Sequence, residues 1–311
     1  MISKTHRPVV VVTGASSGIG RATAHEFARQ GACLVLAARR SDMLEEAARE
    51  CRELGGTAIA VPTDTTDEAA VLALGRAAVE RFGGIDVWFN NAGVGIFGRF
   101  EDLPTEAWRR VIEVNLFGYV HGAKAALPQF LRQGRGVLIN NASIVGRLAK
   151  PDSTAYATSK FAVRGFSEAL MEDFKVNAPH VKVSVVMPGH IGTDIVINSR
   201  KVLNNVGDDI TDEEIDQMRA NFGQRGLPVE NLDNDAIRGL VKMMGEGFRD
   251  NAPTTAAEAA TVILDAVRKG EWRVLVGEDA RQLDEAVRRD PLAAYEGLTL
   301  GTITSVIGGS D

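Results

Sequence analysis

The sequence predicts an α/β protein built on a doubly wound, mainly parallel sheet of seven strands with helices on both faces. Short β-branched or apolar runs alternate with longer helical patterns, which is typical of βαβ units. The strand runs are continuously apolar, as expected for strands whose two faces are both buried. The expected strands span residues 8–13, 33–38, 57–61, 86–89, 136–141, 181–187 and 272–276.

The expected helices lie between these strands, and several begin with Ser, Thr or Asp, whose side chains accept hydrogen bonds from the free amides of a first turn. Residues 195–255 interrupt the alternation because they are richer in Asp, Asn and Gly. We interpret them as an insertion between the sixth and seventh strands, and residues 278–311 as a C-terminal extension. The expected helices span residues 18–30, 42–54, 67–82, 105–132 and 154–177.

Composition disfavours several classes of function. The chain has 35 Lys and Arg against 41 Asp and Glu, so no overall basic field is available to hold nucleic acid. It has no run of 18 apolar residues and no apolar signal core near its start, so we expect a cytoplasmic protein without a membrane span. Cys33 and Cys51 have no histidines at ligand spacing, which predicts a reduced, metal-free protein.

The first strand runs directly into a glycine-rich turn, TGASSGIG, which is followed by a helix. The backbone must turn sharply here, and glycines leave room for a pyrophosphate beside the first amides of the helix. This context favours a dinucleotide site over a merely tight turn. The expected cofactor contacts in the loop are Gly14, Ser16, Ser17, Gly18, Ile19 and Gly20.

The end of the second strand indicates which dinucleotide binds. An NAD site carries an acidic side chain there for the ribose 2′-hydroxyl, whereas this chain has Ala38 followed by Arg39 and Arg40. The arginines can pair with a 2′-phosphate, so we predict NADP(H) in preference to NAD(H), with a solvated basic pair as the alternative. Asp64, which precedes Thr65, either accepts from the adenine amino group or caps the next helix.

A phenol and an ammonium group lie one helical turn apart in YATSK, residues 156–160. A positive charge beside Tyr156 stabilises the phenolate and lowers the pKa of the phenol, which suits a proton donor to a carbonyl near neutral pH. Ser143 ends the fifth strand thirteen residues before Tyr156, where its hydroxyl could hold the substrate oxygen. The three side chains predict the interconversion of a carbonyl and an alcohol.

Together these motifs resemble the short-chain dehydrogenase/reductase family, in the branch that carries TGxxxGxG and YxxxK. The resemblance covers residues 8–195. It implies that Tyr156 is the general acid or base and that Ser143 orients the carbonyl. It also implies that Lys160 tunes Tyr156 and binds the nicotinamide ribose, and that Asn115 holds a water of a proton relay.

The same resemblance implies further cofactor contacts and an assembly. The family usually forms dimers or tetramers through the long helices around 105–132 and 154–177, so a homodimer or homotetramer is expected. Contacts are expected after the fourth strand, beside the adenosine ribose, and after the sixth strand, over the nicotinamide. These contacts are Asn91, Ala92 and Gly93 in the first group, and Pro188, Gly189, Ile191 and Thr193 in the second.

We predict a single Rossmann-like domain over residues 1–311, in which residues 195–255 form a helical substrate lid. Thr211 and Glu214 form an expected capping box at the start of one helix. Apolar side chains then recur at helical spacing in two segments, which either cover the carboxyl ends of the strands or pack on the core. They are Ile215, Met218 and Phe222, and Ile237, Leu240, Val241, Met244 and Phe248.

The leading hypothesis is an NADP(H)-dependent oxidoreductase that interconverts a secondary alcohol and a ketone or aldehyde on a rather apolar small molecule. A carrier-linked ketoreductase is an alternative within this class. The alternatives outside it are a non-catalytic dinucleotide sensor and an epimerase or dehydratase, whose glycine loop would read GxxGxxG. His190 either touches the substrate or contributes only shape. The alternating tail 298–304 is an edge strand, a subunit contact or disordered.

Overall fold

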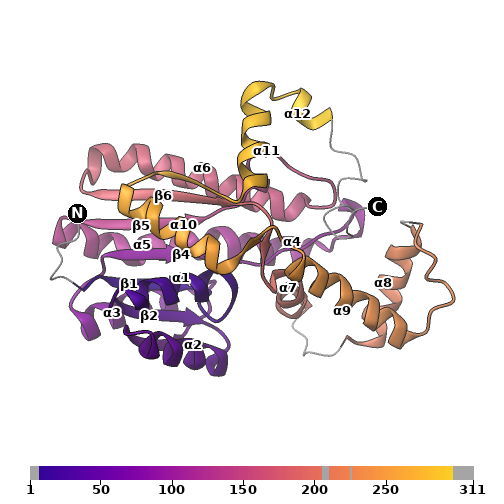
Figure 1. Ribbon diagram of the computed structural model, residues 1–311, viewed down its shortest axis with the longest axis horizontal. Helices are drawn as coiled ribbons and strands as arrows, with labels where there is room; N and C mark the ends of the chain where they lie inside the picture. The colour runs from indigo at the N-terminus through magenta and orange to yellow at the C-terminus, as the bar shows by residue number, and fades with distance from the viewer. Residues whose placement is uncertain (1–6, 205–209, 225, 297–311) are drawn as a thin grey trace.

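The computed structural model describes residues 7–204, 210–224 and 226–296, and over these residues the central sheet has seven parallel strands in the order β3-β2-β1-β4-β5-β6-β9 (Figure 1). The chain order reverses between β1 and β4, which is where ligands bind in open α/β sheets. The predicted fold class is therefore confirmed. The strands are β1 (Val9–Thr13), β2 (Cys33–Ala38), β3 (Thr57–Pro62), β4 (Val87–Asn90), β5 (Gly136–Asn141), β6 (Val181–Pro188) and β9 (Arg273–Val276).

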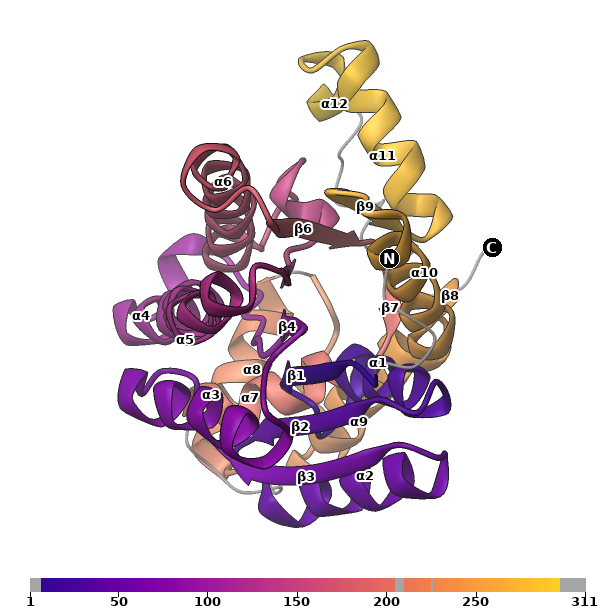
Figure 2. The same cartoon turned by 90° about the vertical axis from the view of Figure 1, so that its left-hand side faces the viewer.

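Helices cover both faces of the sheet (Figure 2). Alternate residues of one strand serve the two layers: Val10 and Val12 of β1 join one apolar cluster, and Val11 joins the other. This explains why the strands are apolar at every position. On one face lie α1 (Gly18–Arg29), α2 (Ser41–Glu53) and α10 (Ala256–Lys269), and on the other α3 (Glu68–Phe82), α5 (Gly118–Gln133) and α6 (Thr154–Asn177).

The helix predicted over residues 105–132 is present, but it is not α-helical throughout. The segment divides into α4 (Thr105–Ile112), a π-helical turn over Glu113–Phe117, and α5. Asn115 lies buried in this turn, and its side chain bonds to the backbone of Val94. A π-helical turn re-aims a side chain within a helix and is frequent at functional sites.

The insertion forms three helices, α7 (Ile195–Asn204), α8 (Asp212–Gln224) and α9 (Asn234–Asp250). The predicted capping box is present, because the Thr211 amide donates to Glu214 Oε2 at 2.9 Å and the Glu214 amide to Thr211 Oγ1 at 3.3 Å. The apolar faces of α8 and α9 pack on each other in a small separate core that contains Ile215, Phe222 and Ile237. They therefore do not pack on the core of the sheet.

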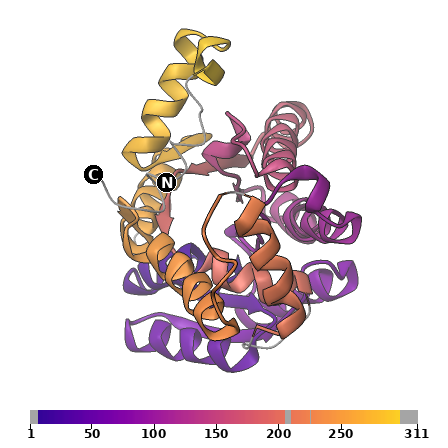
Figure 3. The ribbon, with the colours of Figure 1, turned by 90° about the vertical axis from the view of Figure 1, so that its right-hand side faces the viewer.

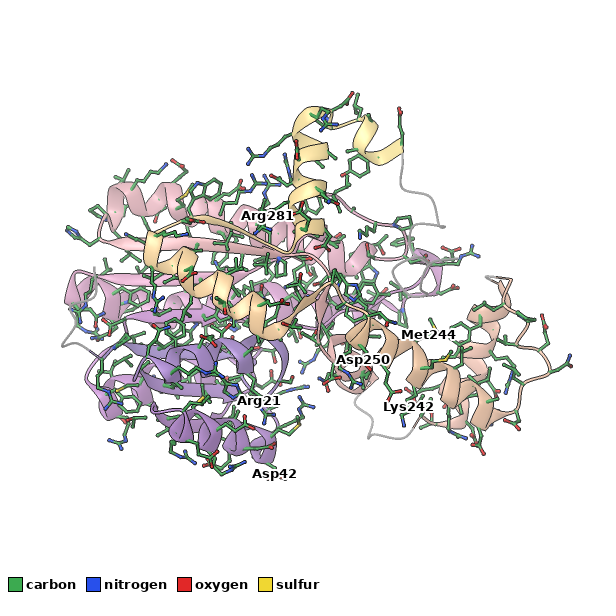
Figure 4. The ribbon with its side chains drawn as sticks, viewed as in Figure 1. Arg21, Asp42, Lys242, Met244, Asp250 and Arg281 are labelled. Carbon is green, nitrogen blue, oxygen red and sulfur yellow. The ribbon has the colours of Figure 1, made fainter. Side chains whose placement is uncertain are left out.

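The arm formed by α8 and α9 projects from the side of the sheet toward which the strand arrows point (Figures 1 and 3). Met244 lies out along α9, and Asp250 lies at the end of the helix nearer the sheet (Figure 4). That end contacts α7 and β7 (Ile191–Gly192), and β7 pairs in parallel with β8 (Thr254–Thr255). The arm is thus attached beside the loop that follows β6.

After β9 the chain continues into α11 (Glu278–Arg289) and α12 (Ala293–Glu296), which rise from one edge of the body (Figure 1). The buried carboxylate of Asp284 in α11 pairs with Arg147, Arg273 and Arg288, which fastens the helix to β9 and to the segment after β5. The alternating segment 298–304 lies outside the described residues. No helix in the described part of the chain is long and apolar enough to cross a membrane.

Candidate active site

A cavity of about 460 Å³ lies at the carboxyl ends of β1 to β6, where the strand order reverses. Most of the side chains singled out in the sequence meet around it. Gly20 and Asn115 do not line it. Those that do are Gly14, Ser16, Ser17, Gly18, Ile19, Arg39, Arg40, Asp64, Thr65, Asn91, Ala92, Gly93, Ser143, Tyr156, Lys160, Pro188, Gly189, Ile191 and Thr193.

The glycine positions of the loop leave no room for side chains. Gly14 has φ +66° and Gly18 has φ +56°, values that L-residues with a side chain rarely adopt. A Cβ on Gly14 would lie 2.8 Å from the Cα of Ala92, and a Cβ on Gly20 would overlap the Gly14 carbonyl oxygen. Gly20 is therefore required for packing within the loop. The bare turn leaves the first amides of α1 beside the cavity, which suits an anionic group.

Two asparagines connect the glycine loop to Lys160. Asn91 Nδ2 donates to the carbonyl oxygens of Thr13 at 3.1 Å and Gly14 at 3.3 Å, and Asn91 Oδ1 accepts from Asn141 Nδ2 at 2.9 Å. The Asn141 carbonyl oxygen in turn accepts from Lys160 Nζ at 2.7 Å. The loop and the lysine are thus held by one hydrogen-bonded chain.

Sequence reasoning did not assign Asn141 a role. It is only 7% exposed and lines the cavity, and its Oδ1 atom is buried without a hydrogen-bond partner among the described residues. Buried polar atoms in folded proteins are nearly always hydrogen-bonded. The signal available in the sequence was the pair of asparagines at the end of the fifth strand, directly before Ala142 and Ser143.

Ser143 lies beside Tyr156 at the cavity, and Lys160 Nζ lies 5.7 Å from the centre of the Tyr156 ring. Burial raises the pKa of Tyr156 to about 12, against the smaller lowering effect of the Ser143 hydroxyl. Burial also lowers the pKa of Lys160 to about 7. The expected lowering of the phenol pKa is therefore not present in the protein alone, because desolvation is the larger effect.

Asn115 fastens the loop after β4 to α6. Its Oδ1 accepts from the Val94 amide at 2.8 Å, and its Nδ2 donates to the Val94 carbonyl oxygen and to Ser159 Oγ, each at 2.9 Å. A Cβ on Gly93 would lie 3.4 Å from Asn115 Oδ1 and 3.7 Å from Lys160 Nζ. Asn115 is thus a buried anchor behind the lysine, and the water implied by the resemblance stays a prediction.

Two arginines follow β2 at the cavity. Arg40 donates to Ser16 Oγ and Ser17 Oγ, each at 3.3 Å, and to Asn198 Oδ1 of α7 at 2.9 Å. Arg39 is exposed and makes no hydrogen bond or ion pair within the described residues. Asn198 was not expected from the sequence, since nothing in the insertion marked α7 as part of the site.

The prediction that Asp64 caps the next helix, the second of its two alternatives, is wrong. Asp67 is the N-cap of α3 and accepts from the amide of Ala70 at 3.1 Å. Asp64 instead accepts from the Thr66 amide at 3.0 Å and pairs with Arg110 at 3.3 Å. Burial alone would raise the pKa of Asp64, but these partners outweigh it and hold the pKa below its ordinary value. Asp64 remains at the cavity as an ionised carboxylate.

The loop after β6 is held by the insertion and by the C-terminal extension. The His190 amide donates to Asp279 Oδ2 of α11 at 2.7 Å, and a Cβ on Gly189 would overlap that carboxylate. His190 Nε2 lies 2.6 Å from the carbonyl oxygen of Phe248 in α9, and the two rings are 4.3 Å apart. Phe248 lines the cavity and His190 does not, so His190 acts here as a fastening residue.

Known proteins match this chain over most of its length. A family model described as short chain dehydrogenase matches residues 8–204. SadH of Mycobacterium tuberculosis, which is named as an oxidoreductase, is 34% identical over 280 residues, 90% of each chain. A short-chain dehydrogenase/reductase from Burkholderia phymatum, solved in complex with NAD, aligns with a TM-score of 0.76 at 28% identity over 94% of this chain and 96% of that one. An alcohol dehydrogenase from Thermococcus sibiricus, solved with 5-hydroxy-NADP, aligns with a TM-score of 0.57 at 32% identity over 66% and 93%.

Proposed function

Because this chain belongs to the short-chain dehydrogenase/reductase family and is an oxidoreductase with a nicotinamide-dinucleotide fold, we propose that it interconverts a secondary alcohol and a ketone or aldehyde, with Tyr156 as general acid or base. The observation that carries this proposal is that the Tyr156 and Ser143 side chains lie together at the wall of the cavity. Two hydroxyl groups that meet in this way can both donate to one carbonyl oxygen. Lys160, one turn along α6, supplies the nearby cation.

The residues around the cavity fit a dinucleotide. Gly14 and Gly20 leave no space for a Cβ, the bare turn suits a pyrophosphate, and α1 begins there. Asn141 Oδ1 is a buried acceptor with no partner in the described protein, and a ribose hydroxyl is a donor of the kind it lacks. When bound, the nicotinamide supplies or accepts the hydride.

In the direction of reduction, Ser143 orients the substrate oxygen and Tyr156 gives it a proton. The high pKa of the phenol keeps Tyr156 protonated until negative charge develops on that oxygen. The phenolate that remains is only partly exposed to water, so it needs a nearby cation and a route for a new proton. Lys160 provides both, because a pKa of about 7 allows its ammonium group to exchange protons near neutral pH.

We propose NADP(H) as the preferred cofactor. Ala38 places no carboxylate at the end of β2, and the guanidinium groups of Arg39 and Arg40 follow it at the cavity. A guanidinium pairs with a phosphate through two parallel hydrogen bonds, which a ribose hydroxyl cannot match. The hydrogen bonds from Arg40 to Ser16 and Ser17 place this charge beside the glycine loop.

We also propose a homo-oligomer that forms through α5 and α6. Three large apolar side chains on this part of the surface are exposed: Phe117 in the π-helical turn, Leu131 in α5 and Phe161 in α6. Exposed apolar groups on neighbouring helices are typical of subunit contacts. Sedimentation of the purified protein would measure the assembly.

The test is oxidation of NADPH across a panel of apolar ketones and aldehydes, with NADH and the variants Tyr156→Phe and Arg39→Ala assayed in parallel. We expect turnover with NADPH, a loss of roughly 100-fold or more in kcat for Tyr156→Phe, and retained NADPH binding in that variant. Arg39→Ala should weaken the binding of NADPH and leave the binding of NADH unchanged. Equal turnover by Tyr156→Phe would contradict the proposed acid, and binding of NADPH without turnover of any carbonyl would favour the sensor.

A further inference from the structure

An exposed aromatic side chain lies against the ring of Tyr156. The centre of the Phe97 ring is 5.5 Å from that of Tyr156, at an interplanar angle of 52°. Phe97 is 48% exposed, so half of its ring is available to a ligand. Phe100 of the same loop is 66% exposed and packs edge-on against Trp108.

The backbone of this loop is held firmly although its aromatic rings are exposed. The Val94 backbone is bonded to Asn115, and the Gly95 amide donates to the buried hydroxyl of Ser199 in α7 at 2.7 Å. The Gly98 amide donates to the carbonyl oxygen of Asp152 at 2.8 Å. Asp152 has φ +57°, in the left-handed region that non-glycine residues rarely occupy. Such conformations persist where the surrounding structure fixes them, and they cluster at functional sites.

Gly95 permits the contact between the two rings. A Cβ at this position would lie 2.9 Å from Cε2 of Phe97 and 3.7 Å from Cδ2 of Tyr156. Any side chain here would force the Phe97 ring to move. The ring is therefore placed in advance by a bare glycine and a fixed backbone, and it loses little conformational freedom when a ligand covers it.

The half of Phe97 that remains in water contributes little to folding, so stability alone does not account for its position. Phe97 does not itself line the cavity, so a substrate whose carbonyl accepts from Tyr156 reaches the Phe97 ring through a substituent that extends past the Tyr156 side chain. Aromatic rings favour other flat π-systems in offset or edge-to-face contact. Arg99 and Glu101 in the same loop pair with each other, which favours an uncharged group in this place.

We propose that Phe97 is a specificity-determining residue, whose ring stacks on a flat aryl or conjugated group attached to the substrate carbonyl. This inference rests on the proposed carbonyl chemistry at Tyr156 and deepens it by naming the substrate class. Aryl ketones are then better substrates than saturated ketones of the same size. The contact acts in binding and leaves the proton transfer unchanged.

The test compares acetophenone with cyclohexyl methyl ketone, which have the same carbon skeleton and differ in the flatness of one ring. The variants are Phe97→Leu, which keeps apolar volume, and Phe97→Tyr, which keeps the ring. Phe100→Leu is the matched control, because Phe100 is in the same loop and packs on Trp108. Comparing the ratio of the two kcat/KM values between variants cancels the intrinsic reactivity of the ketones.

We expect Phe97→Leu to lower the ratio of kcat/KM for acetophenone to kcat/KM for cyclohexyl methyl ketone by roughly 3- to 10-fold, mainly through KM. Phe97→Tyr and Phe100→Leu should leave this ratio unchanged. An unchanged ratio in Phe97→Leu overturns the proposal. Binding of the same ketones to the protein–NADPH complex, read from nicotinamide fluorescence, gives an answer independent of turnover. If Phe97→Leu weakens the binding of acetophenone but not of cyclohexyl methyl ketone, the stacking is supported even when neither ketone is reduced. A failure to reduce either ketone would count against the proposed reaction instead. Failure of the wild type to bind acetophenone more tightly than its saturated partner overturns the stacking.

Discussion

The two sides of the cavity are built differently. On the glycine-loop side, one strand and the turn that follows it supply a continuous stretch from Thr13 to Gly20, whose glycines are required by the positive φ of the turn and by the close approach of Asn91 and Ala92. On the Tyr156 side, the loops are held by residues about 60 to 100 positions away, as in the bonds from Gly95 to Ser199 and from His190 to Asp279. A binding loop made by local turn chemistry can be recognised from a motif. A wall assembled by long-range side chains cannot.

The glycine loop and the arm of α8 and α9 also differ in how they tolerate change. The glycine loop fails sterically, because a single Cβ meets backbone atoms that cannot move away. The arm of α8 and α9 has its own small core and reaches the body mainly at its base, near Arg249, which pairs with Asp194 and Asp250. Exposed ion pairs contribute little to stability. We therefore expect damage to the sheet to be global and damage to the arm to stay local.

The largest effect separates the two cores. Phe130→Ala removes a fully buried ring from the core of the sheet and should lower the free energy of unfolding by about 3–5 kcal/mol. Phe222→Ala removes a ring from the core of the arm, so amide exchange should accelerate over residues 212–250 while the midpoint of global unfolding stays in place. Urea titration and hydrogen exchange measure the two results. An equal loss of global stability in both variants would show that arm and sheet unfold as one unit.

The next effect concerns the glycine loop. Gly14→Ala combines a positive φ with a close approach to the Ala92 backbone, so it should weaken NADPH binding by more than about 100-fold, measured by fluorescence titration. Gly83→Ala is the control, because Gly83 has φ +82° but nothing within 4 Å of its added Cβ. It should lose about 1 kcal/mol of stability and bind NADPH normally. Normal binding by Gly14→Ala would mean that the loop is not the phosphate site.

A smaller effect tests the buried lysine through pH. The pKa of Lys160 falls from 10.5 to about 7 on folding, so between these values the unfolded chain holds a proton that the folded protein does not. The stability of the cofactor-free protein should therefore rise with pH in this range, by at most about 1.4 kcal/mol per pH unit from this group. Below pH 7 the free-energy cost of burying the charged ammonium group of Lys160 is fully present. Tyr156 adds little to the slope below pH 9, because its pKa is raised and both states keep the phenol protonated there.

Lys160→Met is the matched variant for this measurement. Urea titrations at pH 7.5, 8.5 and 9.5 should give a steeper rise in the wild type than in Lys160→Met. If the two proteins show the same slope, Lys160 is charged in the folded state over this range, and its role in proton exchange near neutral pH would have to be abandoned.

The smallest expected effect concerns the contact between the C-terminal extension and the site. Asp279→Ala removes the acceptor of the His190 amide beneath the loop after β6, so KM for NADPH should rise by roughly 10-fold with a smaller change in kcat. Asp279→Asn keeps an oxygen that can accept from that amide and should recover part of the loss. Glu285→Ala, which removes an exposed partner of Arg289 on the same helix, should change neither parameter. A tenfold loss in Glu285→Ala would point to general damage to α11.

Much of the fold was predictable because the signals are local. The strand at Gly136–Asn141 and the helix at Thr154–Asn177 have the expected boundaries, since continuous apolar runs and helical periodicity are set by near neighbours. The π-helical turn at Glu113–Phe117 was not predictable. It depends on Asn115 reaching the Val94 backbone, which lies 21 residues away. The helix α7 was missed for the same reason, because its place in the site depends on Arg40 and Gly95.

The sequence by itself determined the doubly wound sheet, the glycine loop and the pairing of Tyr156 with Lys160 on one helical turn. Each of these follows from steric and periodic rules that act over a few residues. Only the tertiary structure showed that Asn141 links the loop to the lysine, that Asp279 supports the loop after β6, and that Phe97 lies on the Tyr156 ring. These contacts join segments far apart in the chain. Their geometry is set by how the elements pack, and no short-range pattern of residues specifies it.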